Sequence, residues 1–194
     1  MNDAPAEIAF FAVAVCWLGF GAILVMGNRG AAKSERKREI QSHAGFLLHR
    51  GGYAICFVFH RAFFSPFVRM PKPMEEIVSA LAIVAALASV WLCFAAARTL
   101  GRQWSLVARV IDNHELVMQG PYAVVRNPIY LAMFGMLVAT GLAVSRWQAL
   151  IVATVVFLAG SAIRIRSEER LLREAFGRQF DEYASRVPAL FPRV

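Results

Sequence analysis

Three things are scarce in this sequence of 194 residues: cysteine, charge and glycine-rich ligand loops. The three cysteines, Cys16, Cys56 and Cys93, lie far apart and each sits within an apolar run, so neither a disulfide framework nor a zinc site is expected. The sequence also has no Gly-x-Gly-x-x-Gly phosphate loop, Gly-x-Ser-x-Gly elbow or His-Glu-x-x-His zinc pair. The site motifs of several soluble enzyme classes are therefore absent, and we expect no bound metal.

Charged residues make up only 18% of the chain, whereas hydrophobic residues make up 58%, which is more than a soluble protein of this length normally carries. The apolar runs at 8–26, 46–67, 77–97 and 129–163 approach or exceed the roughly 20 residues that cross a bilayer. The last run is of double length and is interrupted at 145–147, which indicates two helices joined by a tight hairpin. The sequence thus predicts an all-α integral membrane protein with about five transmembrane helices.

The first apolar run is predicted to be retained as a transmembrane helix. Its amino-terminal flank is acidic, with Asp3 and Glu7, and the run is longer than the apolar core of a signal peptide. We expect a single membrane domain over residues 1–194, in which 1–98 are amino-terminal transmembrane helices and 99–194 form a catalytic half.

Basic residues alternate between the two sides of the predicted spans. They are numerous after the first span, after the third span and in the tail, and few in the opposite connections. By the positive-inside rule, the amino terminus lies outside and the carboxy terminus in the cytoplasm. The net charge of +8 is thereby assigned to topology and to contact with membrane lipids, and not to nucleic acid.

The connection from 101 to 128 is longer than loops in compact domains usually are, which indicates a function. In the tail, apolar residues recur at helical spacing with charges between them, and Gly177 is expected to break or bend that helix. Its apolar face needs a partner, so we expect the tail and the long connection to fold together into a cytoplasmic cap. Two pairs lie on the preceding helix: Arg164 with Glu168, which is either structural or functional, and Glu169 with Arg173, which is interpreted as solvated helix support.

The polar segment 114–130 lies between two apolar runs and contains Gly120-Pro121 and Asn127-Pro128. Proline lacks an amide donor and restricts the residue before it, so backbone groups in this segment need partners other than a helix ladder. Such groups can bind a ligand.

The motifs of residues 100–192 resemble one known family in their order and spacing. They read L-G-R-Q-W-S, H-E-L-V, G-P-Y, R-N-P-I-Y, an R-x-x-x-E helix, and F-G-x-x-F-x-x-Y-x-x-R-V-P ending at Pro188. This pattern is similar to that of the isoprenylcysteine carboxyl methyltransferases, integral membrane enzymes that use S-adenosylmethionine and are related to phospholipid methyltransferases.

The resemblance implies a cofactor site and a substrate contact. The residues that match the S-adenosylmethionine site are His114, Glu115, Leu116, Val117, Tyr122, Asn127, Pro128, Ile129, Tyr130 and Glu168. Arg164 matches the catalytic contact for the substrate carboxylate. The chain departs from the usual R-H-P-x-Y at Asn127, which can form hydrogen bonds but cannot titrate. Asn127 can therefore have a positioning role but cannot transfer a proton.

The implied reaction is methyl esterification of the terminal carboxylate of an isoprenylated cysteine at the membrane–cytosol interface, with the lipophilic prenylated substrate entering from the bilayer. A phospholipid N-methyltransferase is an alternative, and its amine acceptor needs a base, for which His114 is the obvious residue. A membrane isoprenoid or sterol reductase using NADPH is another, although the compact R-x-x-x-E pair and short tail favour the methyltransferase. A non-enzymatic membrane scaffold explains the spans but not the polar cluster.

Overall fold

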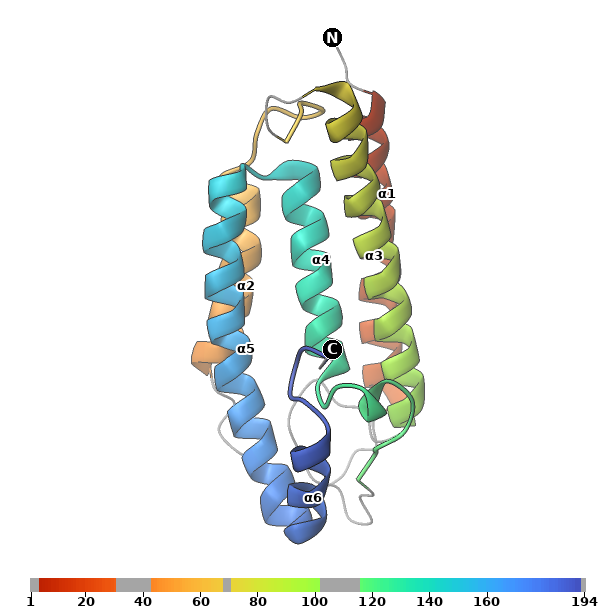
Figure 1. Cartoon of the computed structure of the whole chain (residues 1–194), viewed down its shortest axis with the longest axis vertical. Helices are drawn as coiled ribbons and strands as arrows, with labels where there is room; N and C mark the ends of the chain where they lie inside the picture. Colours follow the sequence, from red (N-terminus) through yellow and green to blue (C-terminus); the bar gives the residue numbers. More distant parts are fainter. Residues whose placement is uncertain (1–3, 31–42, 68–70, 102–115, 193–194) are drawn as a thin grey trace.

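The computed structural model describes residues 4–30, 43–67, 71–101 and 116–192, and every regular element in these ranges is helical. The elements, drawn in Figure 1, are α1 (Ala4–Gly30), α2 (His43–Val58), α3 (Lys72–Leu100), the 3-10 turn η2 (Gly120–Ala123), α4 (Pro128–Val144), α5 (Trp147–Phe176) and α6 (Arg178–Arg186). The all-α prediction is confirmed.

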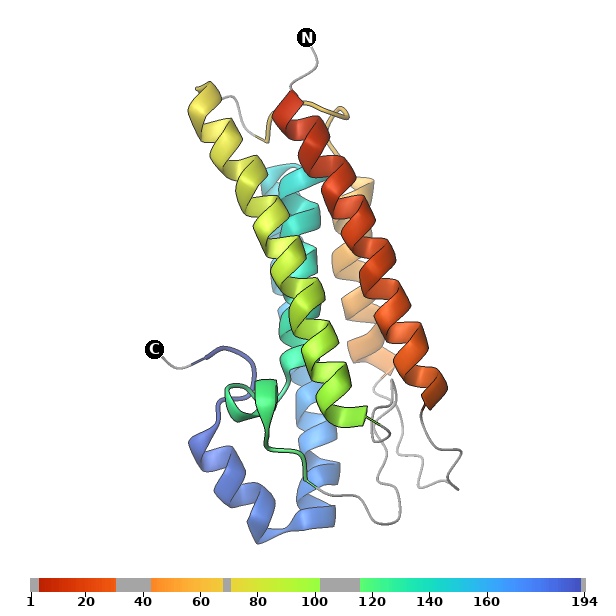
Figure 2. The same ribbon diagram turned by 90° about the vertical axis from the view of Figure 1, so that its right-hand side faces the viewer.

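The five long helices of the described ranges run up and down alongside one another. Helix α3 packs against α1 and α4, while α5 packs against α2 and α4. The carboxy-terminal part of α5 extends beyond the other helices, and α6 folds back from it at the lower end of the bundle (Figures 1 and 2). That end also holds η2 and the start of α4, so it gathers the segments that carry the polar motifs.

Among the described residues, three helices are long and apolar enough to cross a membrane: Ala4–Met26 of α1, then α3 and α5. Helix α4 is apolar but shorter, with 17 residues, and α2 has 16. Large apolar side chains point outward from the long helices, as with Leu18, Trp91 and Val155, which are 76%, 68% and 63% exposed. Such outward apolar surface fits contact with lipid. The chain is thus an all-α membrane protein, and the count of five full spans stays a prediction.

The predicted fourth span, 46–67, is longer than the helix observed. Helix α2 ends at Val58, and the following residues form turns. Arg61 holds these turns against the end of α4. Its guanidinium donates to the carbonyl oxygens of Leu142, Ala143 and Ser145 at 2.8–2.9 Å. These carbonyls at the end of α4 have no partner within their own helix, so Arg61 caps α4 with a side chain from another segment.

The predicted break in the double-length apolar run is confirmed. Helix α4 ends at Val144 and α5 begins at Trp147. Ser145 forms an antiparallel bridge with His60, which fixes the hairpin to the turns after α2. The two helices approach closely beside it, since a Cβ added at Gly141 would collide with the Leu150 side chain.

The interior of the bundle is built from small and aromatic residues. Between α1, α3 and α4 the buried side chains include Phe20, Met136 and several alanines. Between α2, α4 and α5 they are Cys56, Leu137, Ala153 and Phe157. Lipid tails are as apolar as the helix surfaces, so no hydrophobic force draws membrane helices together. Small residues let the helix axes approach closely, which favours van der Waals packing. The helices that carry the polar motifs are therefore held on a rigid base.

Candidate functional site

A polar cluster forms where the first turn of α4 meets the middle of α5. Arg164 Nε donates to the Tyr130 hydroxyl at 2.7 Å, and Arg164 Nη2 lies 3.1 Å from Glu168 Oε1. The Tyr130 hydroxyl in turn donates to Glu168 Oε1 in a short hydrogen bond. We call Tyr130, Arg164 and Glu168 the Tyr130 cluster. The predicted Arg164–Glu168 pair is therefore present, and it is joined by a residue from a different helix.

The cluster is mostly withdrawn from solvent. The side chains of Arg164 and Glu168 are 14% and 23% exposed, and Tyr130 is 8% exposed. The Arg164 guanidinium also lies over the Tyr130 ring, 5.5 Å from its centre. Charges in such a setting interact more strongly than in water, because less solvent screens them. An anion or cation that binds at this cluster would therefore interact strongly with the fixed charge of Arg164 or Glu168.

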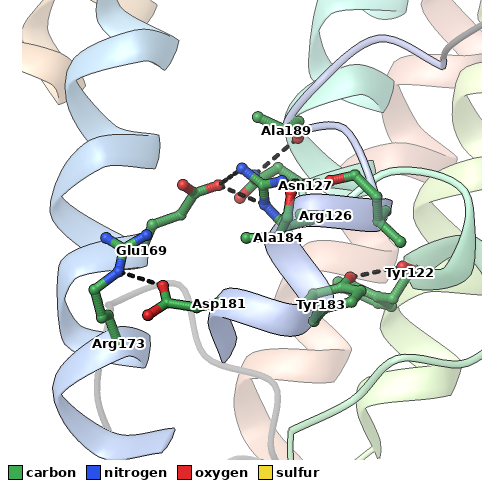
Figure 3. Close-up of polar contacts among 10 residues, drawn as sticks. Tyr122, Arg126, Asn127, Glu169, Arg173, Asp181, Tyr183, Ala184 and Ala189 are labelled. Atoms are coloured by element: carbon green, nitrogen blue, oxygen red, sulfur yellow. Dashed lines mark hydrogen bonds and ion pairs between the residues drawn. The ribbon is translucent and has the colours of Figure 1, made fainter. Parts of the chain in front are cut away.

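The chain enters α4 through a segment that is held by the tail. The amide nitrogens of Arg126 and Asn127 donate to the carbonyl oxygens of Pro188 and Ala189 at 2.9 and 3.1 Å. The Asn127 side-chain amide also donates to the Ala189 carbonyl at 2.9 Å, as Figure 3 shows. We call residues 187–189 the tail strap. Asn127 therefore fastens the tail strap beside the start of α4.

Arg126 reinforces this connection through its guanidinium. It contacts Glu169 Oε1 with Nε and Nη2, each at 2.8 Å, and donates through Nη1 to the carbonyls of Ala184, at 2.9 Å, and Val187. The Arg126 and Glu169 side chains are only 12% and 16% exposed. Three segments, the entrance to α4, helix α5 and the tail, are thus joined by one guanidinium.

The interpretation of Glu169 and Arg173 as a solvated pair is wrong. Glu169 turns to Arg126, and Arg173 instead pairs with Asp181 of α6 at 2.7 Å (Figure 3). Arg173 has Asp181 as its partner because the bend at Gly177 turns α6 back beside α5. Gly177 has φ 50, a conformation that side-chain-bearing residues rarely adopt, so the predicted break at this glycine is confirmed.

The predicted folding of the tail onto the long connection is seen in the part of that connection that is described. The Tyr183 hydroxyl of α6 donates to the backbone carbonyl of Tyr122 at 2.6 Å. Burial raises the pKa of Tyr183 to about 12, because the charged phenolate would lose its hydration there. Tyr183 is therefore neutral and donates this bond throughout the physiological range.

The structure assembles only some of the residues matched to a cofactor site. Tyr130 and Glu168 touch one another, and Asn127 lies at the start of the same helix as Tyr130. Pro128 is buried and opens α4, a position that suits proline because the first helical amide needs no partner. His114 and Glu115 lie outside the described residues, and the remaining matched residues are half-buried or buried without a described polar side-chain contact to the cluster: Leu116, Val117, Tyr122 and Ile129.

One neighbour of the cluster was not recognised from sequence. His49 lies within the predicted span 46–67, is 4% exposed and faces α5. Its Nε2 shares a hydrogen bond of 2.9 Å with Ser161 Oγ, and its ring lies 5.5 Å from that of Tyr130. An ionisable residue within an apolar run is itself a signal of function, and it could have singled out His49.

Within the described ranges, no group of three or more His, Cys, Asp or Glu side chains is placed to hold a metal ion. This finding covers only those ranges.

Comparison with known proteins gives one family and several relatives. The family model for phospholipid methyltransferases matches residues 77–179. The nickel-cobalt-cadmium resistance protein NccN of Alcaligenes xylosoxydans xylosoxydans is 40% identical over 116 residues, which are 58% of this chain and 53% of that protein. Protein-S-isoprenylcysteine O-methyltransferase B of Arabidopsis thaliana is 35% identical over 98 residues, 50% of each chain. A probable protein-S-isoprenylcysteine O-methyltransferase of Oryza sativa subsp. indica is 32% identical over 98 residues, 50% of this chain and 51% of that protein. The chain spans about half the length of the curated relatives it matches.

Proposed function

Because the chain belongs to the phospholipid methyltransferase family, we propose that it is an S-adenosylmethionine-dependent membrane methyltransferase. Its acceptor in this proposal is the terminal carboxylate of an isoprenylated cysteine, which it converts to a methyl ester at the membrane–cytosol interface. Two relatives whose names give that activity support the choice of acceptor.

The observation that carries the proposal is the Tyr130 cluster. It offers one guanidinium and one carboxylate side by side, joined by a tyrosine hydroxyl. Methyl transfer to a carboxylate brings together a cationic cofactor and an anionic acceptor, so a site with one fixed charge of each sign can hold both in alignment.

The residues of the cluster fit the chemistry of S-adenosylmethionine. When bound, this cofactor supplies a methyl group on a positively charged sulfur. Glu168 would accept from its ammonium group, since an ionised carboxylate is an acceptor for several donors at once. Backbone groups near Val117 would contact its remaining polar groups, whereas the amides of Arg126 and Asn127 already donate to the tail strap.

Arg164 would hold the acceptor. A planar guanidinium binds a carboxylate through two parallel hydrogen bonds, which fixes the direction of the carboxylate oxygens. Held in this way, one carboxylate oxygen would be the acceptor of the methyl group that the bound cofactor supplies, and the electron pair of the carbon–sulfur bond would remain with the sulfur. A terminal carboxyl has a reference pKa of about 3.3–3.7 and is already ionised at neutral pH, so no side chain has to remove a proton.

The outer surface of the bundle suits a lipophilic acceptor. Large apolar side chains such as Ile151 and Val155 are exposed on α5, the helix that also carries Arg164. A prenyl chain in the bilayer can therefore lie along apolar surface while its carboxylate reaches the polar end of the bundle.

A phospholipid N-methyltransferase is the second candidate, and the description of the matching family favours it. An amine acceptor must first lose a proton, so the reaction needs a base. His114 is the residue we propose for that role, and it lies outside the described residues.

The test is methyl transfer by the purified protein in lipid nanodiscs, with labelled S-adenosylmethionine and two acceptors: N-acetyl-S-farnesylcysteine and phosphatidylethanolamine. We expect a methyl ester, recognised by release of volatile methanol on base treatment, from the first acceptor only. Binding of S-adenosylhomocysteine and of NADPH is measured side by side by calorimetry, and only the first should bind.

Three results would count against the proposal. Stable N-methyl product without ester would transfer the assignment to the phospholipid reaction, and its rate should then rise steeply with pH. Binding of NADPH alone would favour a membrane reductase. Binding of neither compound by folded protein would overturn the enzymatic proposal.

A further inference from the structure

Helix α2 lies outside the segment that matches the family, yet it reaches the Tyr130 cluster. The match covers residues 77–179, whereas α2 ends at Val58. His49, in the middle of α2, is stacked on Phe157 of α5 with ring centres 4.4 Å apart and planes inclined by 18°. On another side its ring meets that of Tyr130 at 5.5 Å and 53°.

The orientation of the His49 ring is fixed in two ways. Stacking on Phe157 sets its plane, and the 2.9 Å hydrogen bond to Ser161 sets its rotation within that plane. Phe157 and Ser161 are both fully buried and lie four residues apart on α5, so they present one helix face to α2. The His49 ring is therefore held in one orientation, and it can restrict the motion of a side chain that packs on it.

The close approach of α2 and α5 keeps His49 at this place. A Cβ added at Gly160 would lie 2.8 Å from Leu48 Cβ, 2.9 Å from the Gly45 carbonyl oxygen and 3.1 Å from His49 Cδ2. The Gly45 oxygen is a backbone atom and Leu48 Cβ is bonded directly to the backbone, so neither can turn aside. A side chain at position 160 would therefore push α2 away from α5.

We propose that His49 is a positioning residue for the reaction: with Ser161 and Phe157 it holds the ring of Tyr130 so that the Tyr130 hydroxyl stays between Arg164 and Glu168. This inference rests on the proposed function. Tyr130 is the only member of the cluster on α4 and can turn about its own side-chain bonds. The contact with His49 restricts that turning from the side of α2.

The role differs from ordinary core packing in what it predicts for variants. If His49 only filled space, its loss would loosen α2 and α5 in general. If it positions Tyr130, the effect is concentrated at that ring. His49→Phe keeps a ring that can stack on Phe157 and meet Tyr130, whereas His49→Ala removes the ring.

The chain contains four tyrosines, which allows a direct measurement. Each is replaced by 3-fluorotyrosine, and ¹⁹F spectra of the protein in nanodiscs are assigned by four single Tyr→Phe variants. We expect His49→Ala to shift and broaden the Tyr130 resonance while that of Tyr183, in α6, stays in place. His49→Phe should return the Tyr130 resonance close to its original position.

Cys56→Ala is the matched control. Cys56 is on the same helix, is fully buried and packs with Phe157 and Ala153 of α5. It is two turns of helix from His49. The control variant should leave the Tyr130 resonance and methyl transfer unchanged, even if it lowers the melting temperature.

Kinetics supply the second measurement. His49→Ala should lower kcat by about tenfold to a hundredfold, because a small displacement of a positioned group costs that much. His49→Phe should recover most of the lost kcat, even where its melting temperature equals that of His49→Ala. An unchanged Tyr130 resonance in His49→Ala, or an equal shift in Cys56→Ala, would overturn the positioning role. A shifted Tyr130 resonance in a protein that methylates no acceptor would instead overturn the proposed function and leave the contact between His49 and Tyr130 standing.

Discussion

At the scale of single residues, Arg164 and Glu168 share a helix face but carry opposite charges, so they are expected to serve different ligands. Glu168→Gln should weaken S-adenosylhomocysteine binding by about tenfold, since a hydrogen bond to a charged group contributes about 1.5–3 kcal/mol. Arg164→Ala should leave that affinity within about threefold and raise KM for the prenylcysteine acceptor instead. Calorimetry and steady-state kinetics on correctly folded variants separate the two effects.

The alternative for this pair is a purely structural role. In that case both substitutions would lower the melting temperature and reduce cofactor affinity to the same extent. Glu174→Gln is a suitable control, because Glu174 also forms an i,i+4 pair, with Arg170, but both of those side chains are more than 60% exposed. Exposed pairs contribute little, so this variant should behave like the unmodified protein.

Tyr183 gives a prediction about alkaline pH. Its pKa rises from the ordinary value near 10 to about 12 in the folded protein, so folding favours the protonated form. The stability from this group is fully present below about pH 10 and is lost as the pH rises towards 12. Tyr183→Phe should cost about 1 kcal/mol at neutral pH through loss of the bond to Tyr122, and its melting temperature should fall less between pH 10 and 12. A melting curve in detergent at several pH values checks this, and parallel declines would contradict it.

At the scale of elements, the contact between α2 and α5 depends on glycine. Gly160→Ala should destabilise the protein by about 1–3 kcal/mol, because the added Cβ meets backbone and Cβ atoms that cannot move aside. Gly21→Ala in α1 is the matched control, since a Cβ there meets nothing within 4 Å. It should be neutral or slightly stabilising, as alanine favours helix more than glycine does. Thermal unfolding in detergent compares the two, and equal losses would refute the close-packing argument.

Helix boundaries show what local sequence can and cannot predict. The break at 145–147 and the bend at Gly177 were predictable, because polar residues in an apolar run and a glycine in a charged helix are local signals. The end of α2 was not predictable from the apolar run, which continues to Phe67. Helix α2 stops earlier because Arg61 turns to carbonyls of α4, more than 80 residues away in sequence.

At the scale of the whole molecule, the two ends of the bundle are expected to face different compartments. Gln148, at the start of α5, and Gln179, in α6, are both exposed. The start of α5 and helix α6 lie at opposite ends of the bundle (Figure 1). The native cysteines are buried, so an introduced cysteine can be labelled selectively. An impermeant maleimide should label Gln148→Cys in intact cells, and Gln179→Cys only after the membrane is opened. The reverse pattern would place the Tyr130 cluster on the outer side.

The candidate site was predictable in its residues more than in its contacts. Arg164 and Glu168 lie four residues apart, so helical geometry brings them together. The partner of Glu169 lies 43 residues away and that of His49 lies 112 residues away, and no local pattern specifies such pairs. Tertiary packing decided both, which is why the sequence paired Glu169 with Arg173 and did not identify His49 as a neighbour of the cluster.

The tail strap has a consequence for how the protein is made. Residues 184–189 are synthesised after α1 to α5, so Arg126 lacks the carbonyls of Ala184 and Val187 while those helices are being made. A chain that ended at residue 183 would leave the amides of Arg126 and Asn127 without the strap. Translation thus supplies these partners of Arg126 and Asn127 only after all five long helices have been synthesised.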